Sequence, residues 1–340
     1  MATNTSTAGV TTNAAPNFNH AYKLLIGQST NVSAKQSSNS SFQSTVDLDT
    51  KLGSTTKSSS NLYLLEKHQM TYSIQKDNNK DPNKGQITLY NLSDDTVNYI
   101  NKNIRNNLAV ALAVGYEGQE LVLIFKGTVQ WVSDTFNGVD RKTDLHCVDG
   151  GINISLARTS RSYPKGTKVS KIVTDLVTDL GTTKGTVTVD TDATISSASV
   201  MCGNTSHYLD SICKSIDHNV SIQDGSVYVT PRTQRQGTQS AYISPTTGLI
   251  GSPQPFHNDV KPTTKTTKTS KKAKKPTDGV KFKCQVNGSL LPEKTVWLKS
   301  NDYDAAFKVV TVTHTGDFEG KDWTSEVEAI SVPGIISTAS

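Results

Sequence analysis

The chain has 340 residues, too many for one small core, so two or three domains are expected. Hydrophobic residues make up 34 % and aromatic residues 6 %, but the apolar residues cluster in short periodic runs, which argues against a chain disordered throughout. Thr, Ser, Asn, Val and Gly are plentiful, which favours many short strands. No apolar run reaches the roughly 18 residues of a membrane span, and the first residues lack the pattern of a signal peptide.

The formal net charge of +5 is concentrated in one segment. Residues 261–275 contain seven lysines and no acid, so the rest of the chain is near neutral to slightly acidic. The segment has none of the aromatic residues that nucleic-acid sites use to stack bases. We interpret 261–278 as a solvated, flexible basic loop, with the lysines Lys265, Lys268, Lys271, Lys272, Lys274 and Lys275.

The first third of the chain is predicted to be rich in strands. Residues 1–17 are expected to form a flexible arm, and 22–26 a first strand. Residues 28–60 are rich in Ser, Thr, Asn and Lys and are interpreted as a polar insertion, expected to be exposed and mobile. Alternating apolar residues then predict strands at 62–65 and 70–74.

The stretch 86–131 is predicted to fold as a strand, a helix and an antiparallel hairpin. Ser93 can accept hydrogen bonds from the first amides of the helix. The apolar runs 108–114 and 121–125 form the hairpin, and Gly127 is expected to break the second strand, as at a bulge or a barrel corner. Both runs are apolar on both faces, so we expect the helix to cover one face and the core the other.

Residues 158–231 are predicted to form a small α/β domain. Apolar residues at helical spacing predict a helix from Pro164 to Gly181, and Thr205 can cap a second helix. Asp224-Gly225 predicts a tight hairpin turn. Before this domain, 143–157 is expected to form two strands around the turn Asp149-Gly-Gly. After it, alternating runs predict strands at 280–284, 295–298, 307–313 and 323–330, with turns at 247–253 and 315–317.

No metal or cofactor site is predicted. Cys202, His207 and Cys213, with His146 and Cys147, are the best candidate ligands, but their spacings match no zinc pattern. The four cysteines, which include Cys284, are expected to be free and buried, and Trp131 and Trp297 are expected to pack in cores because they lie within alternating strands.

No catalytic residue is predicted either, so the chain is not expected to be an enzyme. Asp149, Asp224, Asp317 and Glu319 all lie in or beside glycine turns, where an acidic side chain serves the turn. The chain contains no G-x-S-x-G motif and no phosphate-binding loop.

Several short motifs occur in an order that resembles the Mu-like baseplate hub proteins of contractile-tailed bacteriophages. The resemblance covers about 20–332, and its polar insertions at 28–60 and 261–278 are longer than the family usually has. The motifs are Ile87–Asn91 with Leu92-Ser93, Val114-Gly-Tyr116, Phe125-Lys-Gly127, the Asp224-Gly225 hairpin after two helices, Thr246–Pro253, and His314–Asp317 with Trp323.

This resemblance implies a mainly β fold with two tail-tube-like β-barrels, at 18–157 and 232–340, around the α/β domain 158–231. It implies a structural virion protein of the tail baseplate, made in the host cytoplasm. Three copies would form a pseudo-sixfold ring between the hexameric tail tube above and a trimeric spike below. The tape-measure and baseplate wedge proteins are further candidate partners; no membrane is involved, and nucleic acid would only pass through the lumen.

The resemblance also implies where this chain would contact its neighbours. The candidate interface residues are Asn91, Leu92, Ser93, Thr247, Gly248, Leu249, Ile250, Gly251, Ser252 and Pro253.

A phage tail adhesin or a host-wall-degrading tail protein remains the alternative from another functional class. A carbohydrate-binding surface would require exposed aromatic residues.

Overall fold

The computed structural model describes residues 19–28, 34–36, 42–44, 56–58, 62–78, 81–149, 156–181, 183–189, 191–231, 239–258 and 277–331. The predicted flexible N-terminal segment 1–17 and the six candidate lysines of the basic loop lie outside the described residues, as does most of the insertion 28–60. Within the described ranges, no helix is long and apolar enough to cross a membrane.

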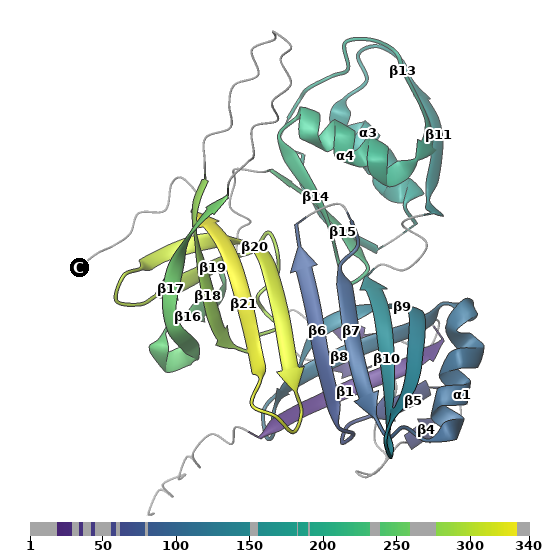
Figure 1. Cartoon of the computed structure of the whole chain (residues 1–340). Coiled ribbons are helices and arrows are strands. Elements are labelled where there is room, and N and C mark those ends of the chain that lie inside the picture. The colour runs from purple at the N-terminus through teal and green to yellow at the C-terminus, as the bar shows by residue number, and fades with distance from the viewer. Residues whose placement is uncertain are drawn as a thin grey trace, which may run out of the picture.

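The predicted mainly β fold is confirmed, and most strands join one large sheet of 14 strands (Figure 1). Eight of them form what we call the first β unit, namely β1 (His20–Gln28), β4 (Thr56–Ser58), β5 (Leu62–Leu65), β6 (Met70–Asp77), β7 (Lys84–Tyr90), β8 (Leu108–Tyr116), β9 (Val122–Asn137) and β10 (Asp140–Asp149). Six form the second β unit, namely β16 (Gln239–Ile243), β17 (Leu249–Asn258), β18 (Thr277–Gln285), β19 (Thr295–Lys299), β20 (Asp304–Asp317) and β21 (Trp323–Ser331).

One strand, β20, belongs to both β units. Its residues 304–308 pair with β19, whereas 311–317 pair with β6, and the register against β21 shifts between Val309 and Thr311. The two strand-rich regions are therefore hydrogen-bonded to each other rather than forming separate sheets. In the insertion, β2 (Ala34–Gln36) pairs with β3 (Phe42–Ser44), and β2 lies against β9. The domain boundaries given above stay predictions.

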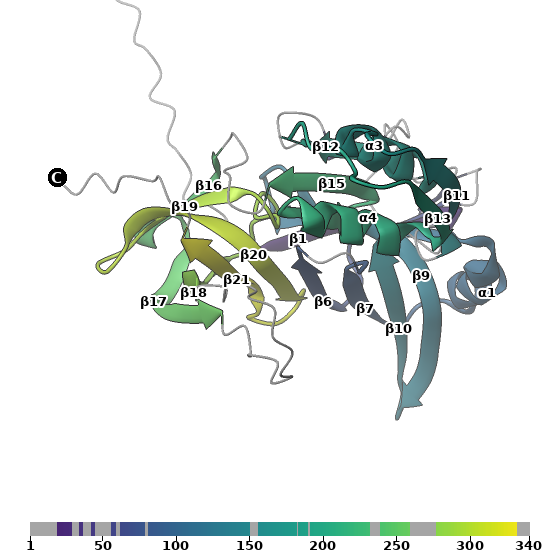
Figure 2. The ribbon, with the colours of Figure 1, turned by 90° about the horizontal axis from the view of Figure 1, so that it is seen from above.

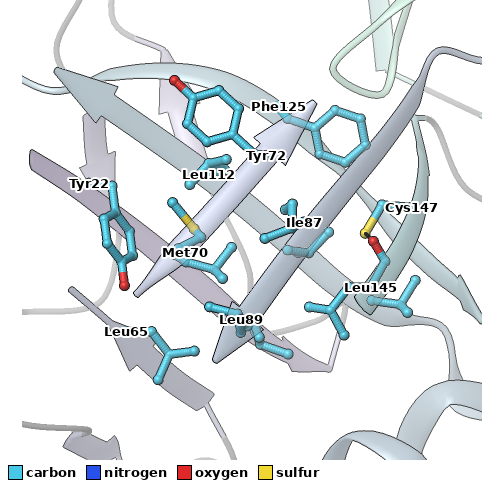
Figure 3. Close-up of a cluster of buried hydrophobic side chains, with 14 of the residues drawn as sticks. Tyr22, Leu65, Met70, Tyr72, Ile87, Leu89, Leu112, Phe125, Leu145 and Cys147 are labelled. Atoms are coloured by element: carbon cyan, nitrogen blue, oxygen red, sulfur yellow. Dashed lines mark hydrogen bonds between the residues drawn. The ribbon is translucent and has the colours of Figure 1, made fainter. Parts of the chain in front are cut away.

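The interior of the first β unit is a large apolar cluster between the layer of β6, β7 and β10 and the layer of β1 and β8 (Figure 3). The helix α1 (Asp94–Asn103) begins after Ser93, as predicted, and contributes Val97 and Ile100 to this interior. Alternate residues of β8 point the other way, because Ala109 and Ala111 join a second cluster with Leu25, Leu62 and Leu123. The expectation that helix and core cover opposite faces of the hairpin is therefore wrong: both lie on the interior side.

Gly127 does not break β9, which is one continuous strand of 16 residues. A Cβ atom at this position would lie 2.2 Å from the carbonyl oxygen of Val148 and 2.9 Å from the ring of Phe125. The glycine is thus required by the close approach of two strands rather than by an interruption. The register of β9 shifts on either side of Gly127 instead, between Leu123 and Phe125 against β8 and between Val129 and Trp131 against β10.

The α/β unit comprises β11 (Arg158–Tyr163), α3 (Val169–Asp179), β12 (Thr183–Val187), β13 (Ser199–Asn204), α4 (Thr205–Ser215), β14 (His218–Gln223) and β15 (Ser226–Pro231). The two helices pack side by side over their own apolar cluster (Figure 2). The cap of α4 is Asn204, whose Oδ1 accepts from the amide of His207 at 3.1 Å, not Thr205 as predicted. The Asp224-Gly225 turn is confirmed, with φ of 51° and 78°.

Two predicted turns are displaced, and a third lies largely outside the described residues. The strand β10 ends at Asp149, and residues 150–155 lie outside the described residues, while Leu156 is 63 % exposed and belongs to no strand. At 247–253 only the start is a turn, because β17 begins at Leu249. Residues 315–317 end β20, and the turn follows them at 318–322.

Candidate assembly surfaces and the buried joint

The predicted interface residues lie at opposite ends of the molecule. Asn91, Leu92 and Ser93 connect β7 to α1 on what we call the first flank, formed by α1, β9 and β10. Residues 247–253 lie on the second flank, formed by β16 and β17. In both views α1 is at the right and β17 at the left (Figures 1 and 2). One chain therefore does not bring the two sets together.

On the first flank, the three predicted residues mainly support structure. The side-chain oxygen of Asn91 accepts from the backbone N–H of Arg141 at 3.0 Å. The backbone N–H of Asn91 donates to the carbonyl of Arg141 at 2.8 Å. Leu92 is 4 % exposed and packs in the interior. Ser93 accepts from the amide of Thr96 at 3.4 Å as the helix cap. These contacts fix the base of the hairpin between β9 and β10.

The part of that hairpin between Trp131 and His146, which we call the arm, carries exposed apolar side chains. Trp131 is 51 % exposed, Phe136 69 % and Val139 95 %. The prediction that Trp131 packs in a core is therefore wrong; its ring stacks on that of His146, with 3.5 Å between centroids. Trp297 is half-buried, and its indole N–H donates to Asp304 at 2.8 Å.

Arg141 ties the arm to α1. Its Nη2 donates to Asp134 Oδ2 at 2.8 Å, its Nη1 donates to Asp94 in the first turn of α1, and its guanidinium lies 5.4 Å from the ring centre of Phe136. The hydrogen bond from Arg141 lowers the pKa of Asp134, against the opposing effect of partial burial. The arm is thus held in one orientation by contacts within the chain.

The second flank also exposes apolar groups beside an open strand edge. Tyr242 is 44 % exposed and Ile250 42 %. Among the pairings of the described residues, β17 bonds only to β18, and β16 only to β19. Of the predicted residues here, Thr247, Ile250, Gly251 and Ser252 are exposed, Gly248 and Leu249 are half-buried, and Pro253 is buried.

The α/β unit is attached to both β units by buried polar contacts that together we call the joint. Asp149, at the end of β10, accepts from the amides of Asp224 and Gly225, both at 2.6 Å, and from Asn83 Nδ2 at 3.0 Å. Lys76 of β6 is fully buried and donates to both carboxylate oxygens of Asp224, at 2.7 and 2.8 Å. Asp149 and Asp224 therefore do not merely serve their own turns, as predicted, but connect two units.

A buried ion pair of the second β unit also binds the α/β unit through hydrogen bonds. Lys308 of β20 pairs with Glu293, and their side chains are 2 % and 5 % exposed. Glu293 also accepts from Thr230 Oγ1 at 2.7 Å and from the side-chain amide of Asn219 at 3.1 Å. Because the other hydrogen-bonding capacity of the carboxylate is satisfied, the charge is tolerated in the interior.

Burial shifts the proton affinity of groups in and beside the joint. Burial and the neighbouring Asp224 raise the pKa of Asp149 to about 6, against the opposing charge of Lys76. Burial, reinforced by Lys76, lowers the pKa of His314 to about 3. The Nδ1 atom of His314 lies 2.8 Å from Ser325 Oγ, so the imidazole is held on β20 beside Lys76.

The candidate metal ligands do not converge. Cys202 is exposed on β13, contrary to the prediction that all four cysteines are buried, whereas Cys147, Cys213 and Cys284 are buried. Within the described ranges, no three His, Cys, Asp or Glu residues form a group that could hold a metal ion. Asp317 serves its turn as predicted, because its Oδ1 accepts from the amide of Gly320 at 3.1 Å.

Sequence reasoning missed both the joint and the arm. Lys76 continues the inward-facing positions of β6 after Met70, Tyr72 and Ile74, so a lysine in the buried phase of a strand was an available signal. The arm has no comparable signal in the sequence, because Trp131 and Phe136 look like ordinary strand residues.

The comparisons with known proteins agree on one class. The model of the baseplate hub gp41 family matches residues 43–292. A search of curated protein sequences finds no match. Similar solved structures include a tail protein from Neisseria meningitidis, with 9 % identity and a TM-score of 0.55, covering 91 % of this chain and 96 % of that one.

Two further structures share the fold. A 43 kDa tail protein of prophage MuSo2 from Shewanella oneidensis has 8 % identity and a TM-score of 0.54, covering 79 % of this chain and 94 % of that one. A type VI secretion system component from E. coli has 9 % identity and a TM-score of 0.53, covering 78 % of this chain and 74 % of that one. With the family model matching most of its length, this chain belongs to the baseplate hub gp41 family and is a structural protein of the bacteriophage tail baseplate.

Proposed function

We propose that three copies of this chain form a closed ring in the baseplate hub, which adapts the hexameric tail tube to a trimeric spike. The observation that carries this proposal is the arrangement of two β units in one continuous sheet, with free flanks at opposite ends. Three such chains would present six β units around one axis. Identical copies joined head to tail form a ring where the rotation between neighbours closes.

The partners follow from the same proposal. A six-unit ring matches the symmetry of a hexameric tube on one side, while its three chains match a trimeric spike on the other. The E. coli protein named above is described as similar to the T4 tail proteins gp27 and gp5, and further similar structures are complexes that contain VgrG. The tape-measure and wedge proteins are proposed as additional neighbours, and DNA as cargo that passes through the lumen.

The proposed role is not catalytic. The family and the similar structures are structural tail proteins. The exposure of Trp131 removes one argument against a carbohydrate-binding adhesin, but its stacking on His146 covers one face of the indole. Cleavage of peptidoglycan or polysaccharide by the purified chain, lost on changing one acidic residue, would contradict the non-catalytic role.

The mass of the assembly tests the proposed ring. We expect sedimentation of the purified chain, alone or with its tube and spike proteins, to give a particle containing three copies. A chain that stays monomeric under both conditions contradicts the proposal. So does a closed hexamer of this chain alone, because six copies would bring twelve β units into the ring.

A further inference from the structure

The arm exposes apolar side chains on both of its faces. Trp131 pairs with His146 and Phe136 with Arg141 in an unbroken register, and Phe136 lies five positions after Trp131. Because side chains alternate along a strand, the two aromatic rings lie on opposite faces of the hairpin. Val139 projects from the tip and is almost fully exposed. A partner that meets the edge of the arm can reach the apolar side chains of both faces.

The outer edge of β9 along the arm has no strand hydrogen-bonded to it among the described residues, although β2 approaches β9. In the pairings of the described residues, β8 accompanies β9 only as far as Thr128, and from Val129 to Asn137 β9 bonds to β10 alone. An unpaired edge of this kind is a template for main-chain pairing with another strand. Main-chain and side-chain groups of the arm thus favour the same kind of partner, one that offers a strand together with apolar side chains.

Ion pairs within the chain favour one orientation of the arm before it meets a partner. Arg141 connects Asp134 within the arm to Asp94 on α1, and it packs over Phe136. Holding the hairpin in place within the free chain reduces the entropy lost on binding. The arm therefore has the properties of a preformed docking element rather than of a mobile loop.

We propose that the arm of one copy docks on the second flank of the next copy, beside the open edge of β17. This inference rests on the proposed ring. In a ring of identical copies, each contact joins two unlike surfaces of the same chain. The arm lies at one end of the molecule, and the other end supplies an open strand edge with the exposed side chains of Tyr242 and Ile250.

Charged substitutions on the arm of the full-length chain test this contact. We expect Phe136→Asp and Val139→Asp to raise the dissociation constant of the three-copy particle by on the order of 30-fold, as for residues central to an interface. The matched control is Val200→Asp, because Val200 is 75 % exposed on β13 of the α/β unit and away from both flanks. The readout is sedimentation over a concentration series, with circular dichroism to verify folding.

A photo-reactive residue at position 139 identifies what the arm touches. We expect cross-links to residues 239–258 of a neighbouring copy, detected by mass spectrometry after mixing differently labelled chains. If the arm variants assemble like the wild type, or if the cross-links lead to another surface or another tail protein, the inference is wrong while the proposed ring stands. If the wild-type chain forms no ring alone or with tube and spike proteins, the proposed function and the inference both fail.

Discussion

The interior of the first β unit and the joint hold distant segments together by different physics. The interior contains aliphatic and aromatic side chains, many of them fully buried, and its strength comes from the area removed from water. The joint buries Lys76, Asp149, Glu293 and Lys308, whose charges are tolerated only in one geometry. Apolar packing therefore makes each unit stable, whereas the joint fixes how the α/β unit sits on the two β units.

The largest effect is expected from leaving one charge of the joint without its partner. Lys308→Met removes the cation from Glu293, which stays buried, and should lower the free energy of unfolding by about 3–5 kcal/mol. Denaturant unfolding followed by circular dichroism measures it. The double variant Lys308→Met with Glu293→Gln should recover part of the loss, because it removes the uncompensated charge.

An exposed ion pair provides the control for this comparison. Lys281 pairs with Glu326, and both side chains are 45 % exposed. Lys281→Met should therefore change the free energy of unfolding by less than about 1 kcal/mol. Equal losses for Lys308→Met and Lys281→Met would contradict the distinction between the joint and ordinary surface charge.

Gly127→Ala tests the packing of the first β unit. It should lower the free energy of unfolding by about 3 kcal/mol or more, because the added Cβ would lie 2.2 Å from the backbone of Val148. Gly181→Ala is the control: Gly181 also disfavours alanine, through its φ of 65°, but the added Cβ would meet nothing within 4 Å. Its cost should stay near 1–2 kcal/mol. A smaller loss at Gly127 than at Gly181 would show that the two strands can separate without penalty.

The sequence predicted the apolar units well and the contacts between them poorly. Periodicity located most strands of the two β units, the Ser93 cap and the Asp224-Gly225 turn, because these features depend on neighbouring residues in the chain. It missed β11 and β13, and the start of β17 was interpreted as a turn. The partner of Asp224 is Lys76, 148 residues away in the sequence, and no local pattern carries that information. The resemblance to the hub family was confirmed by the family model, since it used the order of pieces along the whole chain.

The same limit explains the errors at the candidate interfaces. Leu92 was a candidate contact but is buried, and Trp131 was assigned to a core but is exposed. Leu92 lies in the connection between β7 and α1, where no local pattern shows whether it is covered. Trp131 lies in an alternating strand, and alternation says which residues share a face without saying what covers that face. The exposed aromatic residues of the arm became visible only when the end of β8 relative to β9 was known.

A third prediction concerns how the stability contributed by the buried His314 beside the joint depends on pH. The folded-state pKa of His314 is about 3, below its ordinary value of 6.5, so the fold favours the neutral imidazole. The stability linked to this group is fully present above about pH 6.5 and is lost as pH falls toward 3. Between pH 6.5 and 4.5 the wild type should lose about 2–3 kcal/mol more than His314→Asn, which keeps a polar group near Ser325 but does not titrate.

Thermal or denaturant unfolding at several pH values measures this difference. His207→Asn is the matched control, because His207 is exposed on α4, and its pH profile should follow that of the wild type. Parallel profiles for the wild type and His314→Asn would mean that His314 can be protonated without cost, and would contradict the burial of an imidazole beside Lys76.

The smallest effect should be local and should separate the joint from the interior most clearly. Asp149→Asn replaces a carboxylate that accepts three N–H groups by an amide with one acceptor oxygen, so about 1–2 kcal/mol should be lost where β14 and β15 meet β10. Hydrogen exchange should therefore accelerate at the amides of Asp224 and Gly225 while those of β8 keep their protection, since the interior is untouched. Asp192→Asn, at a fully exposed side chain, should leave both unchanged. Equal acceleration in β8 and at the turn would mean that joint and interior open as one cooperative unit, and the division of roles between them would then be wrong.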